Sequence, residues 1–249
     1  MATLKHFTSY INELLEIEKF KDYAPNGLQV EGKGKLKKII TGVSATQALI
    51  EVAIEREADA IVVHHGWFWG GEDPCIVGMK KKRLKLLMQH DISMLGYHLP
   101  LDAHPELGNN AQLAKRLGIQ TEDVMDAQGV GNFGSFEEYI SLGKLGEKIE
   151  KSLERKPLLI NAGDHAIRRV AWCTGGAQDR IDKAIEAGVD AYISGEISEH
   201  TVHKARESGL HYIAAGHHAT ERYGVEALGD FTAAKFGLLH EFIDVDNPA

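Results

Sequence analysis

The sequence predicts an α/β protein with two similar α/β halves from an internal duplication, each with a mostly parallel sheet flanked by helices. Strand-type and helix-type patterns alternate along the chain, which is typical of βαβ units. The strand patterns are short and continuously apolar, as expected of parallel strands covered on both faces. The second half also repeats the residue pattern of the first. A length of 249 residues is enough to bury a substantial core.

The first half supplies most of these patterns. Leu4, Phe7, Ile11, Leu14 and Leu15 recur at helical spacing with charges between them, so the N-terminal segment is predicted to be an amphipathic helix of the fold rather than a signal peptide. Strand patterns cover 37–43, 58–63 and 92–97. Helix patterns cover 46–57, 80–90 and 109–117, the last of which is stopped by Gly118.

A shift of 131 residues places 39–66 on 170–197. It aligns Gln47 with Gln178 and Asp59-Ala60 with Asp190-Ala191, and it places His64-His65 on Gly195-Glu196. Further on, ISMLGYH (92–98) resembles LHYIAAGH (210–217) with a slip of one residue. Two βαβ units can resemble each other by chance, because the same physical constraints give them similar compositions, but the Asp-Ala pair at the start of both strands favours duplication. We therefore predict a first half, 1–124, with His64, His65 and Asp102, and a second half, 125–249, with His217 and Glu221.

The stretch 120–165 has a weaker pattern. Gly129, Gly131 and Gly134 spell G-x-G-x-x-G, but a dinucleotide-binding fingerprint needs a buried strand before it and a helix directly after it. The preceding TEDVMDAQ is polar. We therefore predict turn glycines here, followed by a helix over about 142–154 that precedes Pro157.

The charge balance excludes some classes of partner. A net charge of -8 provides no global field that would attract nucleic acid or an anionic membrane, so direct nucleic-acid binding is not expected. No apolar run approaches the roughly 20 residues that span a bilayer. Cys75 and Cys173 form no CxxC pair, which favours a reducing, cytoplasmic location. The basic cluster at 80–85 is interpreted either as a solvated helix face or as a rim that steers anions.

Three segments at strand ends carry the candidate chemistry. His64 and His65 end a buried parallel strand, where open α/β sheets place their ligands, and Gly66 permits the turn that would let adjacent histidines share a site. Asp102 follows the next strand in a loop stiffened by Pro100. His217 and Glu221 are four residues apart at the start of a predicted helix, so they lie on one face. Viewed alone, each has a structural explanation; Asp102, for example, fits a turn or cap position.

Together these side chains predict a dinuclear metal site. Three imidazoles and two carboxylates suit two divalent ions that share a bridging carboxylate and keep open positions for water. Zinc, iron, manganese and nickel all fit this ligand chemistry. Two such ions would leave the pocket locally positive, which favours a bound hydroxide and a small anionic or polarisable substrate.

Five segments resemble the Nif-three-like family, in order along essentially the whole chain. They are DYAPNGLQVEG (22–32), VVHHGWFW (62–69), HLPLDAHPELGNNAQLA (98–114), GEISEHTVH (195–203) and AAGHHATE (214–221). Bacterial members carry the name GTP cyclohydrolase 1 type 2 homolog. The resemblance implies a toroidal homohexamer with the metal sites inside. It also implies that His64 and Asp102 hold one ion, that His65 and His217 hold the other, and that Glu221 contacts both.

The predicted function is metal-dependent hydrolysis of a nucleotide or related cyclic amide, like that of a GTP cyclohydrolase, with a link to DNA-damage protection suggested for bacterial relatives. Such a reaction needs a proton carrier. His98, beside the Asp102 segment, and Glu196, at the repeat position of His65, are the candidates, and each is also suited to orienting a metal ligand. The alternative is a metal carrier or regulatory hexameric scaffold without catalysis, which would use the same ligands.

Overall fold

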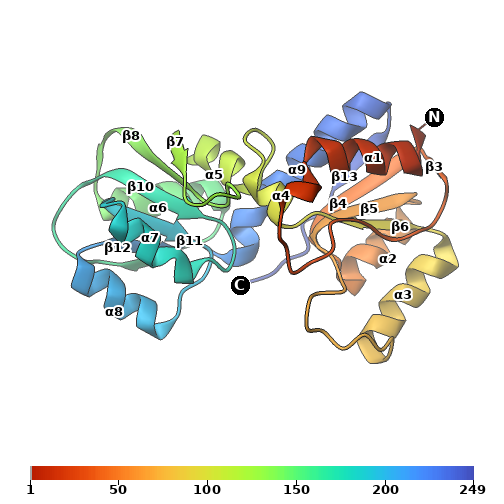
Figure 1. Ribbon diagram of the computed structural model, residues 1–249, viewed down its shortest axis with the longest axis horizontal. Helices are drawn as coiled ribbons and strands as arrows, with labels where there is room; N and C mark the ends of the chain where they lie inside the picture. The colour runs from red at the N-terminus through yellow and green to blue at the C-terminus, as the bar shows by residue number, and fades with distance from the viewer. Residues whose placement is uncertain (1) are drawn as a thin grey trace. The chain divides into compact units, whose positions relative to one another are not determined.

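The computed structural model describes residues 2–249 and divides into two compact units, each built on its own sheet (Figure 1). The first unit comprises the described residues up to Leu101 together with Gly224–Asp246. The second comprises Asp102–Tyr223 with Asn247–Ala249. Two helices pass from one unit to the other, and they are α4 (Leu99–Ala103) and α9 (His217–Phe236).

The sheet of the first unit has the strand order β13-β4-β5-β6-β2. Its strands are β2 (Gly27–Val30), β4 (Lys38–Ser44), β5 (Ala60–His65), β6 (Ser93–Gly96) and β13 (Leu239–Phe242). All neighbours are parallel except β2, which runs antiparallel to β6. A separate two-stranded ribbon pairs β1 (Ala2–Thr3) with β3 (Lys35–Leu36). β4 and β5 are almost wholly buried, which confirms the prediction from their continuous apolar runs.

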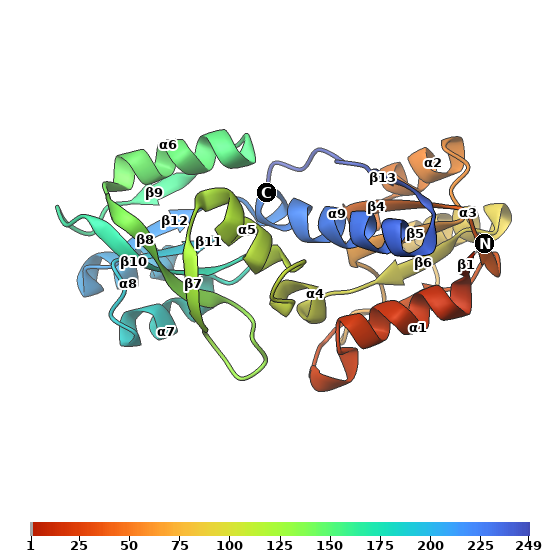
Figure 2. The ribbon, with the colours of Figure 1, turned by 90° about the horizontal axis from the view of Figure 1, so that it is seen from above.

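Helices cover both faces of this sheet (Figures 1 and 2). α2 (Gln47–Glu55) and α3 (Gly78–His90) pack on the face that bears Ile61 and Met94. α1 (Leu4–Leu14) and the second part of α9 lie on the opposite face, where Phe7 contacts Phe236 edge-on. A short helical turn, Ile17–Lys19, follows α1. Within residues 2–249, no helix combines the length and the apolar character that crossing a membrane requires.

The second unit has a mixed sheet of order β7-β8-β10-β11-β12-β9 in which β10, β11 and β12 are parallel. Its strands are β7 (Gln120–Val124), β8 (Asn132–Ile140), β9 (Leu158–Ile160), β10 (Ile167–Cys173), β11 (Ala191–Ser194) and β12 (His211–Ala214). Its helices are α5 (Asn109–Leu117), α6 (Leu142–Leu153), α7 (Ile181–Glu186), which follows the turn Gln178–Arg180, and α8 (Glu199–Ser208). Side chains of α5 and α6 share a core with Trp172 and Ile193.

The two parallel three-strand segments, β4-β5-β6 and β10-β11-β12, have the same local construction. Oδ2 of Asp59 accepts hydrogen bonds from the backbone N–H groups of residues 37 and 38, at 2.7 and 3.1 Å. Oδ2 of Asp190 accepts from those of residues 168 and 169, both at 2.8 Å. Each pair of positions is separated by the same 131 residues as the sequence repeat. The repeated aspartate therefore anchors the start of the neighbouring strand in both units, which supports the internal duplication.

The compact units have different bounds from the predicted halves 1–124 and 125–249. Asp102 groups with the second unit, whereas the second part of α9 and β13 group with the first. The reason is that the C-terminal strand returns to the first sheet, where β13 pairs in parallel with β4. A repeat seen in the sequence does not reveal such an exchange of terminal elements.

The weakly patterned stretch contains β7, β8, α6 and β9. Gly129 and Gly131 lie in the β7–β8 connection with φ values of +75° and +82°, which only glycine adopts at little cost. A strand rather than a helix follows them, so Gly129 and Gly131 are turn glycines, as predicted. The prediction is wrong for Gly134, which lies within β8, where a Cβ atom would collide with the carbonyl oxygen of Gln120. β7 has no clear strand pattern in the sequence because all five of its residues are exposed.

Candidate metal centre

His64 and His65 end β5, and their rings lie side by side. The ring centroids are 4.5 Å apart, so the two adjacent residues share one site instead of pointing to opposite faces. The predicted role of Gly66 needs a correction, because its φ is not positive. A Cβ atom at Gly66 would instead collide with the amide of Gln29. Gly66 is therefore required by the close approach of Gln29.

Each of these two imidazoles is held through its Nδ1 atom. Nδ1 of His64 lies 2.9 Å from the carbonyl oxygen of Tyr97, and Nδ1 of His65 lies 3.0 Å from Oγ of Ser44. A proton on Nδ1 of His64 is donated to that carbonyl, which fixes the tautomer with a lone pair on Nε2. Metal-binding histidines are usually oriented in this way.

His98 belongs to the same cluster. His64, His65 and His98 each offer a ring nitrogen within 4.8 Å of the others, an arrangement that could hold a metal ion. Nδ1 of His98 donates to Oδ1 of Asp22 at 2.9 Å, and its backbone N–H donates to Oδ1 of Asn26 at 2.7 Å. The structure thus brings His98, predicted as a proton carrier, to the two histidines predicted as ligands.

Asp22 is the acceptor on which this part of the site is built. Besides His98 it accepts from the backbone N–H of Leu99 at 3.0 Å and from Nδ2 of Asn26 at 3.0 Å. Burial raises the pKa of the Asp22 carboxyl, but the hydrogen bonds and charge of His98 and the amide of Asn26 outweigh it and lower the pKa to about 2. Sequence reasoning missed Asp22 and Asn26 as site residues, although both lie in the motif at 22–32.

The segment after His98 is a short helix rather than the predicted stiffened loop. α4 runs from Leu99 to Ala103, with Pro100 in its first turn, where the missing N–H of proline costs no helical hydrogen bond. The carboxylate of Asp22 receives the Leu99 N–H and so caps this helix from a distant loop. Sequence reasoning did not detect the helix because its cap comes from 77 residues away.

Asp102, near the end of α4, is buried and fixed by three polar side chains. Its Oδ1 accepts from Nδ2 of Asn109 at 2.8 Å and from Oγ1 of Thr174 at 3.2 Å. Nδ2 of Asn110 donates to its carbonyl oxygen at 3.1 Å. Asp102 is only 6% exposed, so it is not an ordinary surface cap or turn residue. Neither asparagine nor Thr174 was singled out from the sequence.

His217 and Glu221 meet on the first turn of α9, as their spacing predicts. Nε2 of His217 lies 3.2 Å from Oε2 of Glu221, and Nδ1 lies 2.6 Å from Oε1 of Glu196. Burial lowers the pKa of His217, but the hydrogen bonds and charges of Glu221 and Glu196 prevail and raise it to about 9. The two carboxylates therefore favour the protonated, positively charged form of this imidazole.

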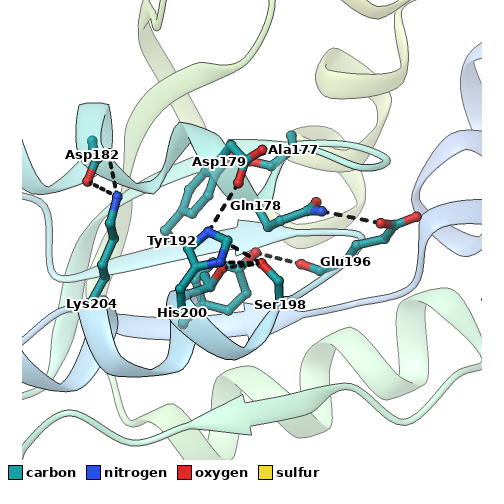
Figure 3. A network of polar contacts seen from close by, with 11 residues as sticks. Ala177, Gln178, Asp179, Asp182, Tyr192, Glu196, Ser198, His200 and Lys204 are labelled. Atoms are coloured by element: carbon teal, nitrogen blue, oxygen red, sulfur yellow. Dashed lines mark hydrogen bonds and ion pairs between the residues drawn. The ribbon is translucent and has the colours of Figure 1, made fainter.

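Glu196 follows β11 and is itself held by neighbours (Figure 3). Nε2 of Gln178 lies 3.4 Å from its Oε2, and the hydroxyl of Tyr212 donates to its carbonyl oxygen at 2.6 Å. Other contacts in Figure 3 fix the loop that carries Gln178. The hydroxyl of Tyr192, for example, donates to the carbonyl oxygen of Ala177 at 2.7 Å. The contact of the Glu196 carboxylate with Nδ1 of His217 fixes the orientation of this imidazole ring.

Two buried carboxylates lie close together in the second unit. Asp102 and Glu221 are 6% and 3% exposed, and each offers a carboxylate oxygen within 4.8 Å of the other. Burial raises the pKa of the Cys173 thiol strongly, and the charges of Asp102 and Glu221 raise it further. Two neighbouring buried carboxylates are costly without compensating positive charge. This donor set therefore fits a divalent cation.

Gly175 provides the space for these groups. It has a φ of +70°, and a Cβ atom there would collide with Oε1 of Glu221 and approach Nε2 of His217. Its carbonyl oxygen accepts from the backbone N–H of Gly195 at 2.9 Å. The Gly-Gly pair at 175–176 was not singled out from the sequence. Its signal is that the shift of 131 residues places it on Ser44-Ala45, at the end of β4.

The model of the family Duf34/NIF3 (NGG1p interacting factor 3) matches residues 2–248. The chain is 57% identical to a GTP cyclohydrolase 1 type 2 homolog of Haemophilus influenzae over 96% of both chains. It is 54% identical to one of Pseudomonas aeruginosa over 94% of both chains.

Solved structures agree with this assignment. The structure of protein ybgI, whose function is described as unknown, superposes with a TM-score of 0.97 at 51% identity and covers 100% of both chains. A protein of Thermus thermophilus superposes with a TM-score of 0.92 at 34% identity, again over 100% of both chains. The chain belongs to the Duf34/NIF3 family.

Proposed function

We propose that the protein is a metal-dependent hydrolase of the GTP cyclohydrolase type 2 kind, acting on a nucleotide or related cyclic amide. Two divalent ions would be held by ligands pooled from both units. His64 and Asp102 would hold one, His65 and His217 the other, and Glu221 would contact both. The observation that carries this proposal is the pair of buried carboxylates, Asp102 and Glu221, in a chain whose β5 ends in two oriented imidazoles.

Two features support a metal site that takes ligands from both units. Asp102 follows His98 by four residues through α4, so the chain itself tethers this carboxylate about one helical turn from the histidine cluster. The ligand types are also complementary, because the first unit supplies two imidazoles and the second supplies one imidazole and both carboxylates. Two divalent ions carry +4, and two carboxylates leave a net positive site suited to an anionic substrate.

The ions, when bound, would lower the pKa of water and polarise the bond under attack. Side chains of the protein would then transfer the proton that the reaction requires. Asp22 holds the Nδ1 proton of His98, so His98 can accept or deliver a proton at Nε2 while Asp22 stabilises the imidazolium that forms. Glu196 contacts Nδ1 of His217 and is better suited to positioning that ligand than to proton transfer.

Elemental analysis joined to an activity screen tests the proposal. Protein purified without added metal is assayed for bound ions and then offered nucleotides and cyclic amides. We expect two ions per chain and hydrolysis that is lost in His65→Ala. Activity should be retained in His203→Ala, because His203 is an exposed histidine of α8 that lies 3.7 Å from the carboxylate of Glu199, outside the proposed ligand set. Bound metal without turnover of any compound would favour the carrier or scaffold function instead.

A substitution of Glu196 should weaken metal binding while the fold is retained. In Glu196→Gln the charged contact to Nδ1 of His217 is lost, and removal of such orienting partners typically costs 10–100-fold in metal affinity. Competition with a coloured chelator measures the affinity. Glu199→Gln, three residues on and exposed, is the matched control and should bind as the native protein does. Native affinity in Glu196→Gln would refute the positioning role.

The homohexamer implied by the resemblance stays a prediction. Sedimentation of the purified protein should give a particle of six subunits, and a stable monomer would contradict it.

We also infer that the protein works in a reducing compartment such as the cytoplasm, because Cys75 and Cys173 are both free thiols and Cys173 is buried.

A further inference from the structure

Two aromatic side chains stand beside the histidine cluster of the first unit. The ring centroids of Tyr23 and Trp69 are 5.6 Å apart, with 36° between the ring planes. Both rings meet His98 nearly edge-on, each at a centroid distance of 5.0 Å. Trp69 also lies 5.9 Å from His65. The aromatic pair therefore borders the proposed proton carrier and a proposed metal ligand at once.

These rings do not belong to the hydrophobic core. Tyr23 is 62% exposed and Trp69 is half-buried, whereas Trp67, two residues earlier, is 6% exposed and donates its indole N–H to the carbonyl of Ala45 at 2.9 Å. The segment after β5 thus buries one tryptophan and presents the other at the site. Core packing explains the position of Trp67 but does not explain the positions of Tyr23 and Trp69.

The backbone of this segment is held in a costly conformation. Phe68, between the two tryptophans, has a φ of +66°, a left-handed conformation that is unfavourable for a bulky residue. The other non-glycine residues with positive φ in residues 2–249 lie at or next to helix ends, which commonly adopt it. Phe68 lies in a loop instead. Strain of this kind persists where the surrounding structure enforces it, often at binding sites.

The loops that carry the two rings are tied together. The backbone N–H of Gly70 donates to the carbonyl of Tyr23 at 2.6 Å. The side-chain amide of Gln29 donates to the carbonyl of Pro25 at 2.8 Å and accepts from the N–H of Trp67 at 2.7 Å. The aromatic pair is therefore set in place before any ligand arrives, which reduces the entropy lost on binding.

We propose that Tyr23 and Trp69 form a subsite that binds a flat heteroaromatic ring of the substrate, such as a nucleobase. Because the two rings already touch, the ligand would stack on the outer face of the pair rather than between them. Its edge would then face His98 and His65. Stacking on aromatic side chains tolerates any base, because every base has a π-face. This inference rests on the proposed function for its position next to the metal ligands, and it adds the residues that would bind the aromatic ring of the substrate.

Titration calorimetry with three probes tests the subsite. Guanosine and adenosine monophosphate carry a base, and ribose 5-phosphate is the matched probe without one. We expect the native protein to bind both nucleotides at least roughly tenfold more tightly than the sugar phosphate, the gain typical of one stacked base. Trp69→Leu and Tyr23→Leu should bring this ratio close to one, and Trp69→Phe should restore most of it.

Controls separate this proposal from the metal proposal. Tyr139→Leu removes a tyrosine that is 68% exposed in the second unit and should keep the native ratio. Tyr23→Leu changes an exposed side chain, so it tests the subsite even if Trp69→Leu fails to fold. A ratio near one in metal-replete native protein, or a native ratio in folded Tyr23→Leu, would overturn the subsite alone. If native protein takes up no divalent metal but still binds the nucleotides at least roughly tenfold more tightly than the sugar phosphate, the metal centre alone would be overturned.

Discussion

Replacing Glu221 with glutamine should remove both metal ions from the protein. The residue is 3% exposed and its carboxylate contacts Nε2 of His217, and the proposed site uses it for both ions. A neutral amide supplies neither the charge nor the bridging oxygens. Because loss of an indirect orienting partner already costs 10–100-fold, loss of this ligand should lower the affinity by at least roughly 100-fold.

Competition with a coloured chelator measures this loss of metal affinity. Two further variants show whether the loss is specific to Glu221. Glu226→Gln changes an acid on the same helix outside the site and should retain both ions. Asp102→Asn should lose one ion and keep the other, because Asp102 is proposed to contact only one. Retention of both ions in Glu221→Gln would show that Glu221 does not bridge them.

Replacing Asp22 with asparagine should be the most destabilising change in the loop at 22–26. The Asp22 side chain is 3% exposed and accepts from His98, Asn26, Leu99 and Ala24. The asparagine side chain keeps one acceptor oxygen, but its NH2 group replaces the second. That group would face the N–H donors that the carboxylate of Asp22 accepts from. With a pKa lowered to about 2 from 3.8, the ionised group should contribute about 2 kcal/mol to the free energy of unfolding at pH 7.

The pH dependence of this effect has a definite sign. The folded-state pKa of Asp22 lies below the unfolded value, so its contribution is fully present above about pH 4 and is lost as the pH falls towards 2. Urea unfolding of Asp22→Asn and native protein should therefore differ most at neutral pH and converge in acid. Asp182→Asn, which removes an exposed ion pair with Lys204, should change stability by less than about 1 kcal/mol. A constant difference between pH 7 and pH 2 would contradict the assigned role.

The sequence predicted those parts of the fold that depend on local chemistry. α5 has the bounds predicted for it, because its end is set by Gly118 at a φ of +62°. β5 extends two residues beyond the apolar run used to predict it, because His64 and His65 continue the strand. The exchange that places β13 beside β4 depends on the tertiary structure, and no local pattern encodes it.

The candidate site divides in the same way. The i,i+4 contact of His217 with Glu221 follows from helical spacing alone. The partners that orient the site are distant in sequence. Asp22 is 76 residues from His98, and Thr174 is 72 from Asp102. Such residues look like ordinary loop and strand-end polar groups until the fold brings them to their partners.

The central proposal is that five side chains, among them Asp102 and Glu221, hold two divalent ions, and anomalous diffraction from crystals of metal-loaded protein tests it most directly. We predict two anomalous peaks per chain, one contacted by His64 and Asp102 and the other by His65 and His217, with Glu221 touching both. A single peak bound only by His64, His65 and His98, or no peak beside Glu221, would contradict it.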